Sequence, residues 1–263
     1  VYADARQLPV DDTIGKHRTG HLAVPAADAK VPPGLDQRHA GGVGHVSEPI
    51  ALMPSRGTPA PGAATATARV ALVTLGCAKN LVDSEIMAGL LAHGGFTLTG
   101  DLRSADVAVV NTCAFIGPSQ KESIDRILEL AALKREGTLR GLVVAGCMPQ
   151  RYGAALAKEL PEVDAFVGTG AFHQIADILD DALAGRGRGV YVEAGRTHLY
   201  DERAPRILTG AGHSAYVKIA EGCDRICAFC AIPGIRGRFQ SRRLESVLAE
   251  TAQLASLGVR EIN

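Results

Sequence analysis

The residues of this sequence whose types and spacing suit chemistry are its six cysteines, which fall into two groups of three. One group, Cys223, Cys227 and Cys230, forms a compact Cys-x3-Cys-x2-Cys motif, whereas the other, Cys77, Cys113 and Cys147, is spread over three separate segments. The sequence shows no signal-peptide pattern, and in a reducing compartment cysteines serve metal or redox chemistry more often than disulfides. The spacing therefore predicts two metal or redox centres rather than a disulfide framework.

The compact motif has a spacing that suits an iron–sulfur cluster. Three thiolates in one tight loop can ligate three irons of a cubane and leave the fourth iron for an outside chelator, such as the amino and carboxylate groups of S-adenosylmethionine. The alternative, a structural zinc site, needs a fourth ligand, and the nearest histidine, His213, is poorly placed on the far side of an expected strand. Phe229, between the last two cysteines, is a candidate to pack against the adenine of the bound molecule; otherwise it fills the loop.

Each of the three dispersed cysteines follows a short apolar run rich in β-branched residues. We expect strands over residues 69–75, 106–112 and 142–145, and a fourth over 164–167. Runs that are apolar on both faces and alternate with helices indicate a parallel sheet, in which the carboxyl ends of the strands share one edge. Cys77, Cys113 and Cys147 are then expected to converge and to suit a second iron–sulfur cluster with one open iron. The alternative is that they are three small buried residues.

The helices between these strands are predicted from their caps and apolar stripes. One is expected to begin at Asp83 or Ser84 and to end at Gly94, and a second to open with a capping box of Ser119 and Glu122. Two more are expected over residues 150–160 and 172–184. The predicted fold class is therefore α/β, with an open parallel sheet.

Composition divides the chain into four parts. Residues 1–67, rich in proline and without a sustained period, are predicted to be a disordered low-complexity tail; 68–190 hold the sheet; 191–213 are predicted to be a linker; and 214–263 begin a second domain. That second domain is expected to start with a strand over 215–220 and to contain a helix over 244–257. Four arginines beyond the compact motif are interpreted as a surface for an acidic partner or as solvated charge: Arg236, Arg238, Arg242 and Arg243.

The overall composition argues against several classes of protein. Among the 263 residues, 28 are Lys or Arg and 28 are Asp or Glu. This balanced charge argues against a basic protein that wraps nucleic acid and against a protein that binds the membrane surface. No apolar stretch approaches the ~20 residues of a membrane-spanning helix. We therefore expect a cytoplasmic protein. The sequence begins with Val1 and stops at Asn263 inside an expected strand, so we interpret it as a fragment.

Five sequence blocks, in order, resemble the radical S-adenosylmethionine methylthiotransferases, and the resemblance covers residues 69–263. The blocks are 75–85 (LGCAKNLVDSE), 111–115 (NTCAF), 146–148 (GCM), 221–230 (EGCDRICAFC) and 231–237 (AIPGIRG), the last continuing to Ser241-Arg242. The resemblance implies an N-terminal open parallel-sheet methylthiotransferase domain, followed by the start of a radical S-adenosylmethionine (β/α) partial barrel.

The resemblance also implies roles for both groups of cysteines. Cys223, Cys227 and Cys230 are expected to hold the radical-generating 4Fe–4S cluster, and Cys77, Cys113 and Cys147 an auxiliary 4Fe–4S cluster that handles the transferred sulfur. An aliphatic C–H bond has no leaving proton, so a radical from S-adenosylmethionine is a physically reasonable way to activate it. The Cys-Ala-Lys-Asn sequence at 77–80 is similar to the branch that methylthiolates the β-carbon of an aspartate in small-subunit ribosomal protein twelve. An electron donor of the flavodoxin or ferredoxin type is implied as a second partner.

Two other functions stay open from the sequence. One is that of the branch that modifies adenosine in tRNA, which typically has Gln-Met-Asn after the first cysteine; the other is a zinc or redox interaction module without catalysis. In the family, the radical domain continues through more βα units and a C-terminal β-barrel domain that helps to bind substrate, so we expect this fragment to be inactive alone. We expect no membrane contact from it and no direct binding of nucleic acid.

Overall fold

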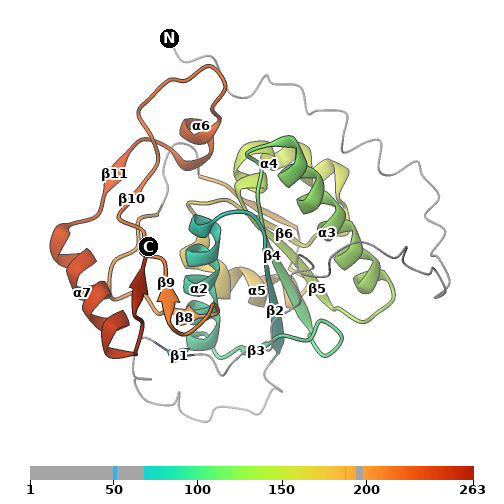
Figure 1. The fold of residues 1–263 in the computed structure, drawn as a ribbon. Coiled ribbons are helices and arrows are strands. Elements are labelled where there is room, and N and C mark those ends of the chain that lie inside the picture. Colours follow the sequence, from blue (N-terminus) through green and yellow to red (C-terminus); the bar gives the residue numbers. More distant parts are fainter. Residues whose placement is uncertain (1–49, 52–67, 187, 194–197) are drawn as a thin grey trace, which may run out of the picture.

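The computed structural model describes residues 50–51, 68–186, 188–193 and 198–263 (Figure 1). The predicted disordered tail, residues 1–67, lies outside these residues apart from the short strand β1 (Ile50–Ala51). That strand pairs antiparallel with β8 (Ile207–Leu208). No helix within the described ranges is both long enough and apolar enough to cross a bilayer.

The main structure is a six-stranded sheet, in which all neighbouring strands are parallel and the order is β3-β2-β4-β5-β6-β7. Its strands are β2 (Arg69–Thr74), β3 (Thr97–Thr99), β4 (Val107–Thr112), β5 (Gly141–Gly146), β6 (Ala165–Val167) and β7 (Gly189–Tyr191). Every residue of the central strands β4 and β5 is buried, which explains why both read as apolar on two faces. The predicted open parallel sheet is confirmed, and β3 and β7 extend it at its two edges.

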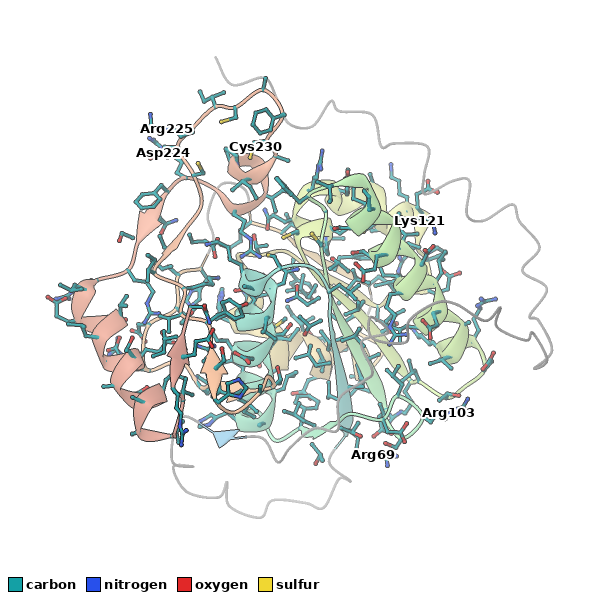
Figure 2. All side chains as sticks on the ribbon, viewed as in Figure 1. Arg69, Arg103, Lys121, Asp224, Arg225 and Cys230 are labelled. Atoms are coloured by element: carbon teal, nitrogen blue, oxygen red, sulfur yellow. The ribbon has the colours of Figure 1, made fainter. Side chains whose placement is uncertain are left out.

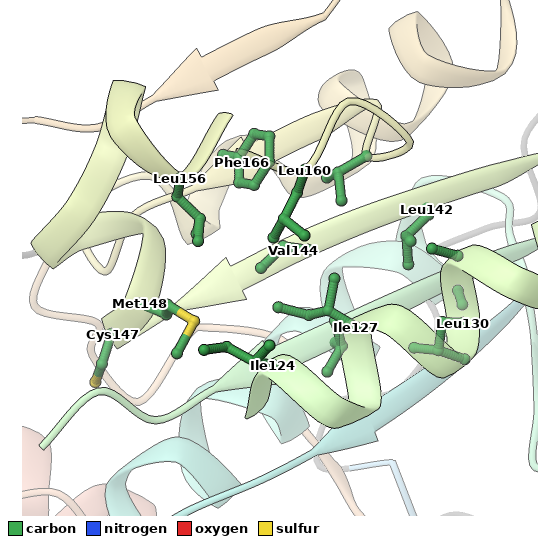
Figure 3. Close-up of a cluster of buried hydrophobic side chains, with 14 of the residues drawn as sticks. Ile124, Ile127, Leu130, Leu142, Val144, Cys147, Met148, Leu156, Leu160 and Phe166 are labelled. Carbon is green, nitrogen blue, oxygen red and sulfur yellow. The ribbon is translucent and has the colours of Figure 1, made fainter. Parts of the chain in front are cut away.

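Helices cover both faces of this sheet (Figure 1). They are α2 (Ala78–His93), α3 (Gly117–Arg135), α4 (Cys147–Glu159), the short 3-10 helix η3 (Phe172–Gln174) and α5 (Ile175–Leu183). One buried apolar cluster unites α3 and α4 with one face of β4 and β5, and a second unites α2 and α5 with the opposite face. Figure 3 shows the first cluster, with Cys147 at its margin and the sulfur turned away from the apolar side chains.

The predicted start of the first helix is wrong. Helix α2 begins at Ala78 with Cys77 as its N-cap residue, so Asp83 and Ser84 lie inside the helix, where both are buried. Ser84 accepts a hydrogen bond from the side chain of Asn111, and Asp83 has cationic partners elsewhere in the fold. These polar residues bind groups elsewhere in the fold and do not cap the helix. The predicted stop at Gly94 is confirmed, because Gly94 is the C-cap residue.

Two other helix starts also differ from the prediction. Helix α3 begins after Ile116 with Pro118 in its first turn, so Ser119 is not its N-cap and the predicted capping box is wrong. Proline fits there because the first-turn N–H has no acceptor within the helix. Helix α4 begins at Cys147 rather than at residue 150, and Gly153 interrupts its helical geometry with a φ of 42°.

The C-terminal part follows the sheet domain as a separate set of short elements. They are β9 (Ser214–Ala215), β10 (Ala220–Glu221), α6 (Ile232–Arg236), β11 (Gln240–Ser241), α7 (Leu244–Ser256) and β12 (Glu261–Ile262). Strands β9 and β12 pair in parallel although β10, α6, β11 and α7 lie between them in the chain, while β10 pairs antiparallel with β11. The single strand predicted over 215–220 is therefore wrong, because its two ends pair with different partners and Lys218 between them forms buried ion pairs.

Candidate metal centres

The first group of cysteines lies where three adjacent strands end. Cys77 caps α2 shortly after β2, Cys113 follows β4, and Cys147 is the first residue of α4, directly after β5. Thr112 of β4 pairs with Gly146 of β5. Cys113 and Cys147 each follow directly after one member of this pair, so they leave two neighbouring strands at the same level. The fold therefore puts all three thiols at the carboxyl edge of the sheet; we call them the first triad.

The backbone beside the first triad is held in conformations that only glycine adopts readily. Gly76 has a φ of +94°, and a Cβ there would lie 2.8 Å from the Cβ of Cys113 and 3.3 Å from its Sγ. Gly146 has a φ of +100°, and a Cβ there would lie 2.3 Å from Asn111 Oδ1. The two glycines let β2 and β5 turn closely around the end of β4. Steric crowding thus explains why a glycine precedes Cys77 and Cys147 in the sequence.

The donor set of the first triad is three thiols, the ligand type that iron–sulfur clusters use. Cys113 and Cys147 are buried, whereas Cys77 is exposed. Within the part of the chain that the structure describes, no three Cys, His, Asp or Glu side chains are close enough to hold one metal ion together. A cubane binds each thiolate through a different iron, so its ligands stand farther apart than those of a tetrahedral zinc site.

A network of buried charges connects the first triad with the C-terminal part; we call it the charge network. Its ion pairs join Lys218 Nζ to Asp83 Oδ1 (2.6 Å) and Glu221 Oε2 (2.5 Å), and Arg236 Nη1 to Asp83 Oδ2 (2.9 Å) and Glu221 Oε2 (3.1 Å). All four of these side chains are buried. Burial by itself raises the pKa of Asp83, but Lys218 and Arg236 together hold that pKa below its ordinary value.

The charge network ends at the sulfur of the first triad. Arg236 Nη2 lies 3.6 Å from Cys147 Sγ and donates to Asn80 Oδ1 at 2.7 Å. Asn80 itself lies on α2, where its amide donates to the carbonyl oxygens of Leu75 and Thr112, the residues just before the glycine and the cysteine of the site. Burial raises the pKa of the Cys147 thiol to about 11, and the guanidinium of Arg236 acts in the opposite direction.

The second triad, Cys223, Cys227 and Cys230, lies on an outer loop between β10 and α6. Figure 2 shows Asp224, Arg225 and Cys230 together on this loop at the periphery of the molecule. The loop is closed by a hydrogen bond from the backbone of Cys223 to Gly237 O (3.1 Å) and by one from Cys230 to Cys227 O (3.1 Å). Gly222, with a φ of +75°, allows the loop to approach the carbonyl of Arg238. Phe229 is 89% exposed, so its packing against adenine stays a prediction.

Sequence reasoning missed the charge network. Arg236 and Arg242 were interpreted as surface charges, but both are buried; Arg238 and Arg243 are the exposed members of that group. One signal was present: Lys218 sits in the middle of an otherwise apolar run, which is an unusual position for an ammonium group without a buried partner.

Comparisons with known proteins give one family match and several close relatives. Residues 69–168 match the family described as "Uncharacterized protein family UPF0004". The chain is 49% identical over 193 residues to "Ribosomal protein uS12 methylthiotransferase RimO" of Desulforamulus reducens, and 50% identical over 192 residues to the protein of that name from Myxococcus xanthus. These alignments cover 73% of this chain, but only 43% and 40% of the two relatives. The chain thus spans about two fifths of the length of the curated relatives it matches.

Proposed function

We propose, from the premise that this chain belongs to the RimO methylthiotransferase family, that its parent protein methylthiolates an aspartate of small-subunit ribosomal protein twelve by radical S-adenosylmethionine chemistry. The observation that carries this proposal is the pairing of two thiol triads: three cysteines at the ends of adjacent strands, and three more on a loop joined to them by buried charges. Neither acid–base catalysis nor a single metal ion requires such a pair of sites.

Each triad has its own role in this proposal. Cys77, Cys113 and Cys147 hold the auxiliary 4Fe–4S cluster, and Cys223, Cys227 and Cys230 hold the radical-generating one. When bound, the clusters and S-adenosylmethionine supply the reducing power and the sulfur for replacing an aliphatic hydrogen. The protein's part is placement and exclusion of water, since the strand ends fix the first triad and Cys113 and Cys147 are shielded from solvent.

The accessibility of the second triad suits a site that must admit large molecules. Cys227 is exposed, and Phe229 stands free on the loop to pack against the adenine of S-adenosylmethionine. The ribosomal protein is the proposed substrate, a flavodoxin- or ferredoxin-type protein the proposed electron donor, and the cytoplasm the proposed compartment. Because the chain covers about two fifths of its relatives, we propose turnover for the full-length protein and cluster binding for this chain.

The first prediction tests cluster binding. Anaerobic reconstitution of the chain with iron and sulfide is expected to give a brown protein with charge-transfer absorbance, because each triad offers three cysteine sulfurs, the ligands of such clusters. Changing Cys223, Cys227 and Cys230 together to Ala is expected to remove about half of the bound iron, and the same change in Cys77, Cys113 and Cys147 the other half. Iron and sulfide analysis measures both. A colourless protein that binds zinc instead would support an interaction module and contradict the proposal.

Substrate choice is tested in cells that lack the full-length gene. Mass spectrometry is expected to show loss of the methylthio group from the ribosomal aspartate, with tRNA modification intact. Loss of methylthio-adenosine from tRNA, with the aspartate still modified, would assign the protein to the tRNA branch.

A further inference from the structure

Arg236 lies on α6, just beyond the loop of the second triad, but contacts the first triad. It is the last residue of α6, six positions after Cys230, and the carbonyl of its neighbour Gly237 accepts the hydrogen bond that closes the second loop at Cys223. Its side chain nevertheless lies against Cys147 and Asn80. One residue thus touches the sulfur of one triad while its backbone borders the loop of the other.

Helix α6 is fixed in this position by contacts that do not involve charge. Ile235 is buried in the apolar cluster formed by α3, α4 and the sheet, and its carbonyl accepts a hydrogen bond from Thr169 Oγ1 at 2.9 Å. The guanidinium of Arg236 is therefore delivered to Cys147 by a packed helix, and its placement does not depend on ion pairs alone.

The charge network together with Lys79, which lies two residues after Cys77, has one more cation than carboxylates. Among the buried groups of the charge network, the carboxylates of Asp83 and Glu221 are matched by the cations of Lys218 and Arg236. Lys79 adds a further cation at the margin, 3.4 Å from Glu221 Oε1 and 44% exposed. The set thus has an excess of positive charge. An iron–sulfur core with three thiolates carries net negative charge, which this excess complements.

We infer that Arg236 is a positioning residue for the first triad: from the helix that follows the loop of the second triad, its guanidinium orients the Cys147 sulfur and provides positive charge beside it. This inference rests on the proposed function, because it takes the first triad as a cluster site. Arginine suits the task because its planar fork serves several acceptors at once, here Asp83, Glu221 and Asn80 together with the sulfur. A lysine would provide charge but not that set of directions.

The test measures the reduction potential of the first cluster in isolation. In a chain with Cys223, Cys227 and Cys230 changed to Ala, only the first triad is left to bind iron, and Arg236→Gln is introduced into that background. Loss of a buried positive charge destabilises the reduced, more negative cluster, so its one-electron reduction is expected to become at least tenfold less favourable, a shift of 59 mV to more negative potential. Spectroelectrochemistry or redox titration followed by EPR measures this potential.

A second variant separates an effect on the cluster from a failure to fold. Arg236→Gln combined with Asp83→Asn removes one charge of each sign and leaves Lys218 paired with Glu221, so folding is expected to survive while Cys147 loses its donor. This double variant is also expected to have the more negative potential, because the charge removed beside the sulfur is the cation. Arg236→Lys is expected to recover part of the shift. The matched control is Arg238→Gln, two residues after Arg236 but with a 79% exposed side chain, which is expected to leave the potential unchanged.

The possible outcomes separate the inference from the proposed function. A parent chain that binds no cluster at the first triad would overturn the proposed function, and this inference with it. A cluster could instead form at the first triad with the same potential and the same iron content in two chains: the chain in which only Cys223, Cys227 and Cys230 are changed, and the charge-balanced double variant in that background. That result would overturn the inference alone. A shift of equal size in Arg238→Gln would also overturn it, because the effect would then not depend on contact with Cys147.

Discussion

At the scale of single residues, the buried charges around Asp83 explain how a polar helix face can lie inside the protein. Removing one partner from a buried ion pair is costly, because the remaining charge is left without compensation in a medium of low polarity. Asp83 bonds to two cations at once, so its carboxylate is ionised in the folded state despite burial. The stability of the protein is therefore expected to depend on the charge of this one side chain.

Asp83→Asn is expected to lower the free energy of unfolding at pH 7 by about 3–5 kcal/mol, because Lys218 and Arg236 lose a shared counter-ion. Asp83 has a folded-state pKa below its ordinary value of 3.8, so its stabilising effect is complete above that value and is lost as the pH falls through the folded-state pKa. Urea titrations over a pH series measure this. The control Asp125→Asn, in an exposed pair with Lys121, is expected to change stability by about 0–1 kcal/mol. Equal effects from the two substitutions would contradict the role of burial.

At the scale of elements, α2 organises the molecule. Its first turn carries Asn80 beside the first triad, its middle carries the buried acids Asp83 and Glu85, and its last turns pack against the segment that leads to β8. Gly89 makes that last contact possible, since a Cβ there would lie 2.3 Å from Pro205 O and 2.7 Å from Arg206 N. The predicted linker therefore lies directly on α2 where the structure describes it.

Gly89→Ala is expected to destabilise the protein by about 1–3 kcal/mol, because the added methyl group would push the backbone at Pro205 away from α2. This sign is opposite to that of an isolated helix, where Ala is favoured over Gly by ~0.8–1 kcal/mol. Thermal and urea denaturation measure the change. Gly117→Ala, at the start of α3, where an added Cβ would meet no atom within 4 Å, is the matched control and is expected to be neutral or slightly stabilising. If both substitutions stabilise the protein, the contact between the linker and α2 is not maintained in solution.

At the scale of the whole molecule, a second set of buried ion pairs connects the sheet domain with the C-terminal part. Arg206 pairs with Glu85 of α2 through Nη2 and with Glu250 of α7 through Nη1, each at 2.6 Å. Glu250 also pairs with Arg242, whose guanidinium lies over the ring of Tyr200. A segment between the two parts thus bonds to both and holds them together.

Arg206→Gln is expected to reduce the free energy of unfolding by about 3–5 kcal/mol, because Glu85 loses its cation and Glu250 keeps only Arg242. Cleavage by a protease within residues 198–213 is expected to become faster than in the parent chain, since this segment loses its central contact. Denaturation and timed proteolysis measure the two effects. Arg203→Gln, a 78% exposed neighbour paired with Asp201, is expected to leave both nearly unchanged. Similar proteolysis of the two variants would refute a specific role for Arg206 in joining the parts.

Much of this molecule was predictable from local sequence. Apolar β-branched runs determine the four predicted strands, their parallel arrangement follows from the helices between them, and that arrangement puts Cys77, Cys113 and Cys147 at one edge. The end of α2 at Gly94 was also predictable from residue type.

Only the tertiary structure decided where the charged residues lie. Asp83 resembles a helix cap in sequence, yet its partner Arg236 is 153 positions away, and the same separation hid the burial of that arginine. The strand predicted over 215–220 divides for a similar reason, because β9 pairs with β12 while β10 pairs with β11. Apolar periodicity is a property of neighbouring residues, whereas an ion pair or a strand pairing is decided by which distant groups the fold brings within reach.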